Sequence, residues 1–196
     1  MSEEEIVGYF GYGSLVNRTT HRTDIVDAVP ARLIGWQRCW MPRRDTSVFD
    51  VAILSVRRRQ GAVTDGLLVF DRAENLPQID ERERHYRRVI LEEDELQFDE
   101  RSAPQCAIHV YEIEPDPLLA FGTQRVLRSY LDAVLQGFLF EHGEEGVHRF
   151  VAETESFDIG ILDDRADPLY QRRVTLSDYE QALLDDAVAH LPSVSR

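Results

Sequence analysis

Two short segments of the sequence combine residue types that can bind and transform a small molecule. The first is Gly11-Tyr12-Gly13-Ser14-Leu15, where an apolar stretch runs into a glycine-rich turn. Glycine lets the backbone approach a ligand closely, and successive backbone N–H groups near the start of a helix can bind an anion. The same residue types are typical of a tight turn in which Ser14 caps the following helix. The turn is therefore a candidate anion-binding site with a purely structural alternative.

The second segment, residues 79–89, offers two carboxylates for general acid/base chemistry. Glu81 and Glu83 both lie in it, close to several arginines. A carboxylate that moves protons must reach into a pocket, where partial burial raises its pKa. The alternative is an exposed helix on which a pair such as Glu83 with Arg87 adds only about 0.3 kcal/mol of stability.

The composition excludes several classes of function. The 196 residues include 22 basic ones, all arginine, against 36 acidic ones, and the net charge is −14. A chain without lysine cannot form a Schiff base through lysine, bind pyridoxal phosphate in that way or contain a P-loop. The acidic balance argues against nucleic acid or an anionic membrane as the main partner.

Cysteine and histidine usage gives no sign of a metal site. Cys39 and Cys106 are far apart and form no CxxC motif, and the six histidines lack a metal-binding spacing. The N-terminus is acidic, unlike the basic start of a signal peptide, and no apolar run reaches the ~20 residues needed to span a bilayer. We therefore expect a soluble, cytoplasmic protein.

The hydrophobic pattern predicts one domain over residues 1–196, with strands first and helices later. Expected strands cover 6–12, 31–41, 50–58, 66–70, 87–91 and 106–113, with a turn at 61–65. Expected helices lie within 17–26 and at 74–83, 123–141, 144–151 and 177–190, with Thr123 and Gly143 as caps of the longest. This order predicts an α+β fold with a mixed, mostly antiparallel sheet curled into a small β-barrel. Helices flank it and are concentrated in the C-terminal half.

Taken together, the two segments resemble the γ-glutamylcyclotransferase superfamily. Its first strand ends in a Tyr-Gly-Ser turn, which corresponds here to residues 12–15. Its catalytic glutamate closes a Leu-Asp-x-x-Glu pattern, which is Ile79-Asp80-Glu81-Arg82-Glu83 in this chain and selects Glu83 rather than Glu81. Further matches are 31–33, 66–68, and a helix with Ser129-Tyr130-Leu131 and Gly137, so the resemblance covers roughly residues 6–140.

The resemblance implies an enzyme that converts a γ-glutamyl amide or peptide into 5-oxoproline and an amine, as in glutathione metabolism. Glu83 would be the general base and acid, and Tyr12, Gly13, Ser14 and Leu15 would bind the substrate. No metal or organic cofactor is implied, and the partner would be a small γ-glutamyl compound. The alternative is a noncatalytic module on the same fold that binds a γ-glutamyl or amino-acid ligand.

Two departures from the family pattern bear on the substrate. In the glutathione-specific branch an Ile-Trp pair follows the turn, and here Val16-Asn17 stands in its place. The leaving amine therefore stays open among glutathione, a dipeptide, a γ-glutamylamine and a larger compound, and the oligomeric state is open as well. Beyond about residue 145 the match fades. There Asp164-Arg165, Pro168 and Tyr170 form a polar loop that either walls the pocket or belongs to the surface.

Overall fold

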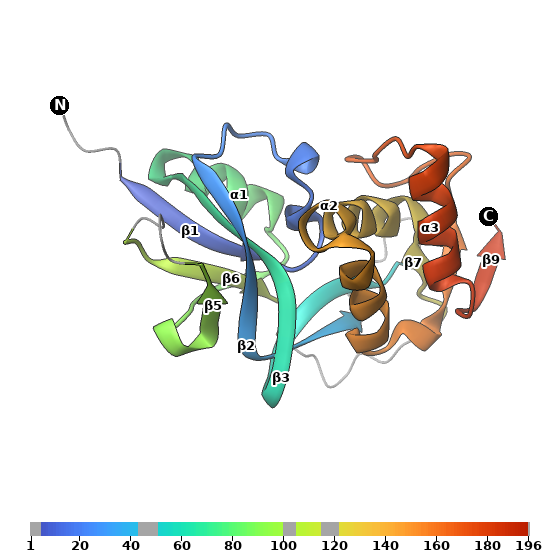
Figure 1. Cartoon of the computed structure of the whole chain (residues 1–196), viewed down its shortest axis with the longest axis horizontal. Helices are drawn as coiled ribbons and strands as arrows, with labels where there is room; N and C mark the ends of the chain where they lie inside the picture. Colours follow the sequence, from blue (N-terminus) through green and yellow to red (C-terminus); the bar gives the residue numbers. More distant parts are fainter. Residues whose placement is uncertain (1–4, 43–50, 100–104, 115–121, 196) are drawn as a thin grey trace.

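A six-stranded mixed sheet forms the larger part of the fold (Figure 1). The computed structural model of the chain describes residues 5–42, 51–99, 105–114 and 122–195. The strand order is β4-β6-β1-β3-β2-β5. All neighbouring strands are antiparallel except β1 and β6, which are parallel. The strands are β1 (Ile6–Gly11), β2 (Asp27–Met41), β3 (Ile53–Arg72), β4 (Arg87–Ile90), β5 (Leu96–Phe98) and β6 (Ile108–Glu112). The expected α+β fold with a mostly antiparallel sheet is confirmed.

The sheet does not close into the expected barrel. Its order begins at β4 and ends at β5, and no pairing joins these two edge strands within the part of the chain that the structure describes. A closed barrel needs such a pairing between its first and last strands. The two edges are short, with four residues in β4 and three in β5, which limits their exposed hydrogen-bonding groups.

One long strand replaces the two strands and the turn predicted over residues 50–70. β3 pairs with β2 on both sides of an irregularity, where Ile34 faces Val63 and Trp36 faces Arg58. Gly61 lies in this irregularity with φ +80°. The glycine that predicted a turn therefore marks a bulge, which bends the strand without ending it. The predicted start at position 50 lies outside the described residues.

The segment after β1 forms two 3-10 helices of one turn each, Ser14–Val16 and Arg18–Thr20, and the second is the short helix predicted within 17–26. Asn17 caps this helix, because its side chain accepts hydrogen bonds from the backbone and hydroxyl of Thr19. The Asn17 amide also donates to the Ala133 carbonyl and the Gln136 side chain, at 2.9 and 3.0 Å. It thereby fastens the turn to the longest helix.

Three α-helices follow the sequence pattern with shifted ends. They are α1 (Leu76–Arg82), α2 (Arg128–Glu153) and α3 (Asp178–Val188), the last begun by a Ser177 capping box. Thr123 is not the N-cap of α2, since that helix begins after Leu127. Gly143 has φ +67° and breaks α2 where the sequence predicts the end of one helix and the start of the next. No helix in the described part of the chain is long and apolar enough to cross a membrane.

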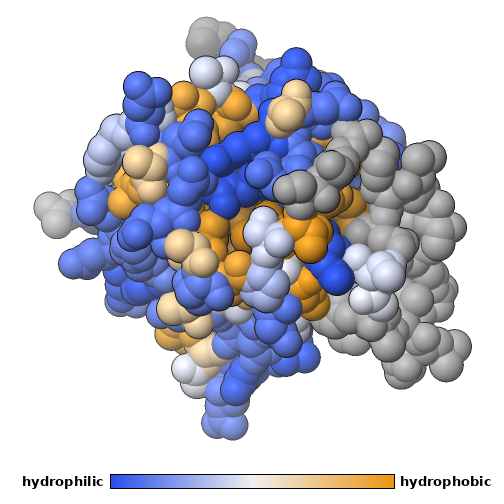
Figure 2. Space-filling view, turned by 90° about the vertical axis from the view of Figure 1, so that its right-hand side faces the viewer, coloured by the Kyte–Doolittle hydropathy of each residue, from blue (hydrophilic) through white to orange (hydrophobic). Residues whose placement is uncertain are grey.

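A second sheet of three short parallel strands lies at the α3 end of the molecule (Figure 1). It consists of β7 (Val126–Leu127), β8 (Ile161–Asp163) and β9 (Ser193–Ser195). The face of the molecule that shows this end is mainly hydrophilic, with hydrophobic residues in small areas near its centre (Figure 2). The sequence does not predict these strands, because two or three residues are too few to show the alternation of apolar and polar residues that is typical of a strand.

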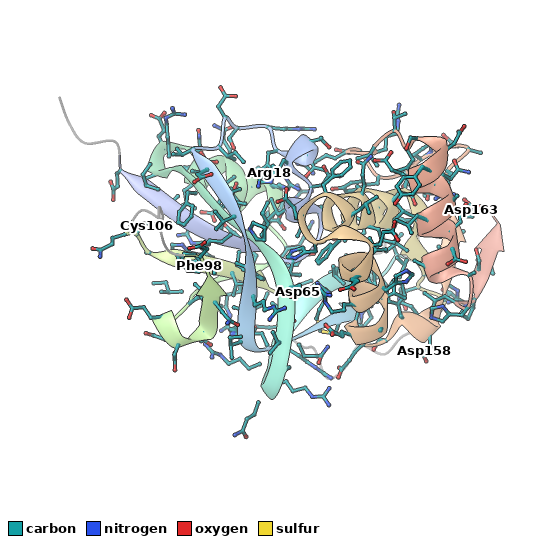
Figure 3. All side chains as sticks on the ribbon, in the orientation of Figure 1. Arg18, Asp65, Phe98, Cys106, Asp158 and Asp163 are labelled. Atoms are coloured by element: carbon teal, nitrogen blue, oxygen red, sulfur yellow. The ribbon has the colours of Figure 1, made fainter. Side chains whose placement is uncertain are left out.

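Helix α2 packs closely against the sheet and the turn after β1. The largest buried side chains include Trp36, Trp40, Tyr9, Phe10, Phe70, Phe138 and Phe150. Arg18 and Asp65 lie beside α2 in Figure 3, and they pair with Glu141 and Arg149 of that helix at 2.6 and 2.8 Å. Gly137 sits directly on the turn, since a Cβ there would lie 2.6 Å from the Asn17 nitrogen. Only glycine permits this approach.

Replacing Gly137 therefore tests the contact between α2 and the turn. Alanine in a helix interior normally adds about 1 kcal/mol of stability over glycine. For Gly137→Ala we expect the opposite, a loss of about 1–3 kcal/mol in the free energy of unfolding, because backbone atoms of Asn17 must move. Urea denaturation measures the difference, and Gly122→Ala is the control because its nearest atom would lie 3.8 Å from the new Cβ. A stabilised Gly137→Ala protein would contradict this packing.

Candidate active site

A cavity of about 220 Å³ lies where the turn after β1, the end of α1 and the start of α2 meet. It joins a smaller cavity of about 30 Å³ against the turn, and Ser14, Leu54, Glu83, Tyr86 and Tyr130 line both. The structure therefore brings together the two segments that the sequence singles out, although about 70 residues separate them in the chain. The cavity of 220 Å³ is lined by Ser14, Val51, Ala52, Ile53, Leu54, Arg82, Glu83, His85, Tyr86, Leu127, Tyr130, Tyr170 and Arg172.

Glu83 is the buried carboxylate of this cavity. It follows the last residue of α1, where its backbone N–H donates to the Ile79 carbonyl and its carbonyl accepts from Tyr86. The short helix thus ends with the Glu83 side chain directed inward and 14% exposed. Burial raises the pKa of Glu83, and the positive charges of Arg82 and Arg172 offset only part of that rise. A carboxylate with a raised pKa is a stronger base than an ordinary one and is therefore better suited to accept and return a proton.

Arg82 connects this carboxylate to the turn. Its Nε lies 3.1 Å from a Glu83 oxygen, and one terminal nitrogen donates to the Ser14 hydroxyl at 3.1 Å. The other terminal nitrogen donates to the Thr20 carbonyl, also at 3.1 Å. The Arg82 side chain is 8% exposed, so its position is fixed by these bonds. One guanidinium group therefore sets the distance between the carboxylate and the turn.

The four predicted turn residues share the small cavity, but they are placed differently. Tyr12 and Leu15 are buried in the core, and the Tyr12 hydroxyl donates to the Tyr111 carbonyl at 2.5 Å, away from solvent. The backbone at Gly13 and Ser14 faces Tyr130 of α2. A Cβ at Gly13 would lie 2.8 Å from the Tyr130 hydroxyl, so this position requires glycine. Burial raises the pKa of Tyr130, and the nearby Ser14 backbone acts against this rise.

A buried arginine, Arg38, binds the backbone directly before the turn. Arg38 is 1% exposed, and one of its terminal nitrogens donates to the carbonyls of Tyr12 and Asp65 at 3.3 and 3.1 Å. Its guanidinium group lies 4.1 Å from the Phe150 ring centroid, a cation–π contact within the core. Since the Tyr12 carbonyl precedes the turn directly, Arg38 holds the backbone from which Gly13 and Ser14 project.

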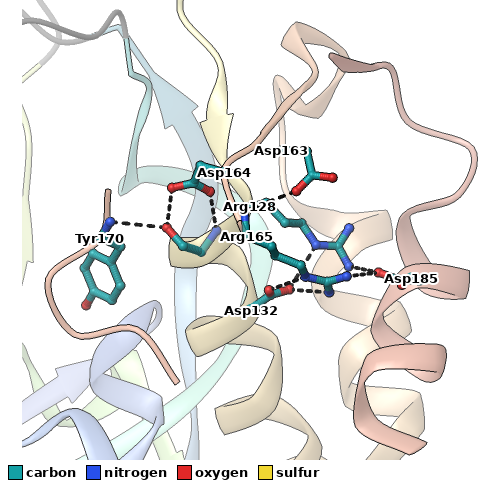
Figure 4. A network of polar contacts seen from close by, with 8 residues as sticks. Arg128, Asp132, Asp163, Asp164, Arg165, Tyr170 and Asp185 are labelled. Carbon is teal, nitrogen blue, oxygen red and sulfur yellow. Dashed lines mark hydrogen bonds and ion pairs between the residues drawn. The ribbon is translucent and has the colours of Figure 1, made fainter. Parts of the chain in front are cut away.

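The polar loop after β8 walls the cavity, which decides between the two interpretations of this loop. Asp164 is 1% exposed and accepts from the Ser129 backbone, the Ser129 hydroxyl and the Leu169 backbone, at 2.7, 2.6 and 2.9 Å. The Tyr170 backbone donates to the Ser129 hydroxyl at 3.2 Å (Figure 4). These bonds cap the first turn of α2 and place Tyr170 and Arg172 in the cavity wall.

The neighbouring ionic network, also shown in Figure 4, is fully paired and joins elements of the C-terminal half. Arg128 and Arg165 both bind Asp132 of α2 and Asp185 of α3. Each carboxylate therefore faces two guanidinium groups and each guanidinium group faces two carboxylates. We interpret this network as the fastening between α2, the polar loop and α3.

The structure also decides the alternatives that the sequence left open for Glu81 and for the pair of Glu83 with Arg87. Glu81 is exposed and lies 3.7 Å from Arg84, so it belongs to the solvated face of α1. The alternative pair of Glu83 with Arg87 is wrong, because Arg87 pairs with Glu112 and Glu114.

Arg82 and Arg172 are the site residues that sequence reasoning misses. The position of Arg82 beside Glu83 is the only local signal for either of them. His85 is exposed and lines the cavity mouth. Among the described residues, no group of three His, Cys, Asp or Glu side chains could hold a metal ion.

Solved structures of other proteins share this fold at low sequence identity. A gamma-glutamyl cyclotransferase is similar with a TM-score of 0.56 and 15% identity, over 93% of this chain and 99% of its own. An uncharacterized protein from Homo sapiens is similar with a TM-score of 0.57 and 14% identity, over the same shares of the two chains. YkqA from Bacillus subtilis is similar with a TM-score of 0.53 and 16% identity, over 74% of this chain and 52% of its own.

Neither a protein-family model nor a curated protein sequence matches the chain. The structural likeness confirms the γ-glutamylcyclotransferase-like fold that the sequence resemblance implies. At 14–16% identity the likeness defines the fold, and the chemistry must be argued from the site itself.

The buried Glu83 gives a prediction about stability and pH. Because its pKa is raised in the folded protein, the folded state holds the proton more tightly than the unfolded chain does. The stabilising contribution of Glu83 is therefore complete at low pH and is lost as the pH rises through the raised pKa. At pH 7 we expect Glu83→Gln to be more stable than the wild type, by about 1.4 kcal/mol for each unit of pKa shift.

Urea denaturation at pH 7 and pH 4 measures this difference. The advantage of Glu83→Gln should shrink at pH 4, where the wild-type carboxyl is protonated in the folded state. A variant that is less stable than the wild type at pH 7 would show that Glu83 is stabilised there as a carboxylate.

Proposed function

We propose that this protein is an enzyme of the γ-glutamylcyclotransferase type, which converts a γ-glutamyl amide or peptide to 5-oxoproline and a free amine. The observation that carries the proposal is the meeting of the buried Glu83 and the Gly13-Ser14 turn in one cavity. A proton acceptor and a set of backbone donors are the two components that this reaction requires. The fold shared with a gamma-glutamyl cyclotransferase supports the proposal.

In the proposed reaction the substrate supplies its own nucleophile. Glu83 takes a proton from the α-ammonium group, and the freed amine attacks the γ-carbonyl carbon. A new C–N bond closes the five-membered ring of 5-oxoproline, and the bond from the γ-carbon to the leaving nitrogen breaks. Glu83 then returns its proton to the leaving nitrogen. The second proton, which the ring nitrogen loses as the lactam forms, goes to the same nitrogen, so that the amine leaves as an ammonium ion and the protons balance over the cycle. No serine, cysteine or lysine nucleophile takes part.

The turn has the task of holding the glutamyl part in a ring-closing conformation. The small cavity against the turn is lined by Gly13, Ser14 and Tyr130, beside Glu83. The Ser14 backbone N–H would donate to the glutamyl carboxylate or to the oxyanion that develops on the γ-carbonyl. Fixing the two reacting ends in this way corresponds to effective concentrations of about 10⁵ M or more. Positioning therefore supplies a large part of the rate enhancement.

The test is 5-oxoproline release from a panel of glutathione, γ-glutamyl dipeptides and γ-glutamyl-lysine, measured by mass spectrometry. We expect the wild type to form product from at least one compound and Glu83→Gln to lose at least about 100-fold in kcat, because the proton acceptor is missing. Glu74→Gln is the control, since it removes an exposed carboxylate just before α1 that lines none of these cavities. This control should keep its activity.

Two results would count against the proposal. Near-normal turnover by Glu83→Gln would remove Glu83 from the mechanism. No product from any compound, with ligand binding retained by the folded protein, would instead support a noncatalytic binding module.

A further inference from the structure

A second and more polar cavity of about 530 Å³ opens beside the candidate active site. Arg82 and Arg172 line both this cavity and the one that contains Glu83, so these two side chains form the boundary between the cavities. Arg22 and Arg84 also line it, against one acidic residue, Glu81. We call the part formed by Arg22, Arg84 and Arg172 the arginine groove. It concentrates positive charge in a chain whose net charge is −14.

The charges of the arginine groove are poorly neutralised by the protein. Among the described residues, the ion pair of Arg84 is a 3.7 Å contact with the exposed Glu81. Neither Arg22 nor Arg172 has an ion pair of 4 Å or less with another described residue. The Nε atom of Arg172 is buried and has no hydrogen-bond partner in the described structure. Burial lowers the pKa of Arg172, and the nearby charges of Arg82 and Arg22 add to this effect.

A buried guanidinium nitrogen without an acceptor is costly, since an unsatisfied buried polar group loses about 1–3 kcal/mol. A carboxylate or phosphate oxygen would remove this cost, because arginine binds such groups through paired, charge-assisted hydrogen bonds. The fully paired network of Arg128, Asp132, Arg165 and Asp185 shows the contrast (Figure 4). There the protein supplies the anions itself. In the arginine groove the lining residues supply one carboxylate, that of the exposed Glu81.

The sizes of the cavities indicate which part of a substrate reaches the groove. The cavity at Glu83 has about 220 Å³, which is below the ~300 Å³ at which typical small-molecule pockets begin. A γ-glutamyl group held against the turn occupies part of this volume and leaves little room for the group attached to its γ-carbonyl. That group would lie toward Arg82 and Arg172, the two side chains that also line the 530 Å³ cavity.

We propose that the arginine groove binds acidic groups of the leaving amine, so that the preferred substrates are γ-glutamyl peptides that release an acidic amino acid. This inference rests on the proposed function, because it assigns the leaving side of the same site. Arg22 and Arg84 provide the long-range attraction at the opening, and Arg172 provides the buried contact closest to Glu83. The bonds that form and break are those of the cyclisation itself.

Two peptides of nearly equal shape test the inference. γ-Glutamyl-glutamate and γ-glutamyl-glutamine differ by one carboxylate on the released residue. We expect kcat/KM, measured by 5-oxoproline release, to be about tenfold higher for γ-glutamyl-glutamate. In the double variant Arg22→Gln/Arg84→Gln this ratio should fall about tenfold. Arg59→Gln is the control, since Arg59 is exposed and pairs with Glu155 outside both cavities, and it should change the ratio less than twofold.

A ratio near one in the wild type, or a ratio that the double variant leaves unchanged, would overturn the inference. Isothermal titration calorimetry of both peptides keeps this test separate from the proposed function. If no 5-oxoproline forms, the proposed function fails. Tighter binding of γ-glutamyl-glutamate that depends on Arg22 and Arg84 would then still support an acid-binding groove. Equal binding of the two peptides would refute it.

Discussion

The close contact between helix α2 and the turn after β1 is the constraint on which the site depends. Two glycines make it possible, because a Cβ at Gly13 would lie 2.8 Å from the Tyr130 hydroxyl and a Cβ at Gly137 would lie 2.6 Å from the Asn17 backbone. The buried amide of Asn17 fastens the same contact through the Ala133 carbonyl. Because the helix presses on the turn, the Ser14 backbone faces a small cavity instead of solvent.

This packing also produces the electrostatic character of the site. Glu83 is buried between the turn and α1, and burial raises its pKa despite the arginines beside it. Arg82 bridges Glu83 and Ser14, while Asp164 ties the loop with Tyr170 and Arg172 to the start of α2. The protein thus places a poorly solvated carboxylate next to positive charge that the described residues do not fully neutralise. Such an arrangement costs stability and is typical of functional sites.

The parts of this structure that the sequence predicts are those with a local signal. β1, α1 and the two segments around Ser14 and Glu83 follow from glycine positions, apolar runs and a short motif. The twenty residues of β3 were divided wrongly, because a glycine at a bulge has the same sequence signal as a glycine in a turn. The short helix predicted within 17–26 is a single 3-10 turn, Arg18–Thr20, which Asn17 caps.

Arg172 shows why the remainder of the site could not be predicted from sequence. It reaches the cavity only through the loop fixed by Asp164, and it lies almost 90 residues from Glu83 in the chain. Neither the hydrophobic periodicity of the sequence nor a sequence motif connects the two positions. The three parallel strands β7, β8 and β9 are equally nonlocal, because each has only two or three residues and depends on its partners for pairing. The family resemblance ends near residue 140, so it covers neither Arg172 nor the strands β8 and β9.

The most direct test of this account is a crystal structure of Glu83→Gln with bound γ-glutamyl-glutamate, a variant in which the substrate should remain uncleaved. We expect the glutamyl part in the 220 Å³ cavity at Glu83, on the side of Gly13 and Ser14, with its α-amine within hydrogen-bonding distance of the side chain at position 83. The two carboxylates of the second residue should face Arg84 and Arg172. A peptide bound in the opposite direction, or an α-amine directed away from position 83, would contradict the assignment of the site.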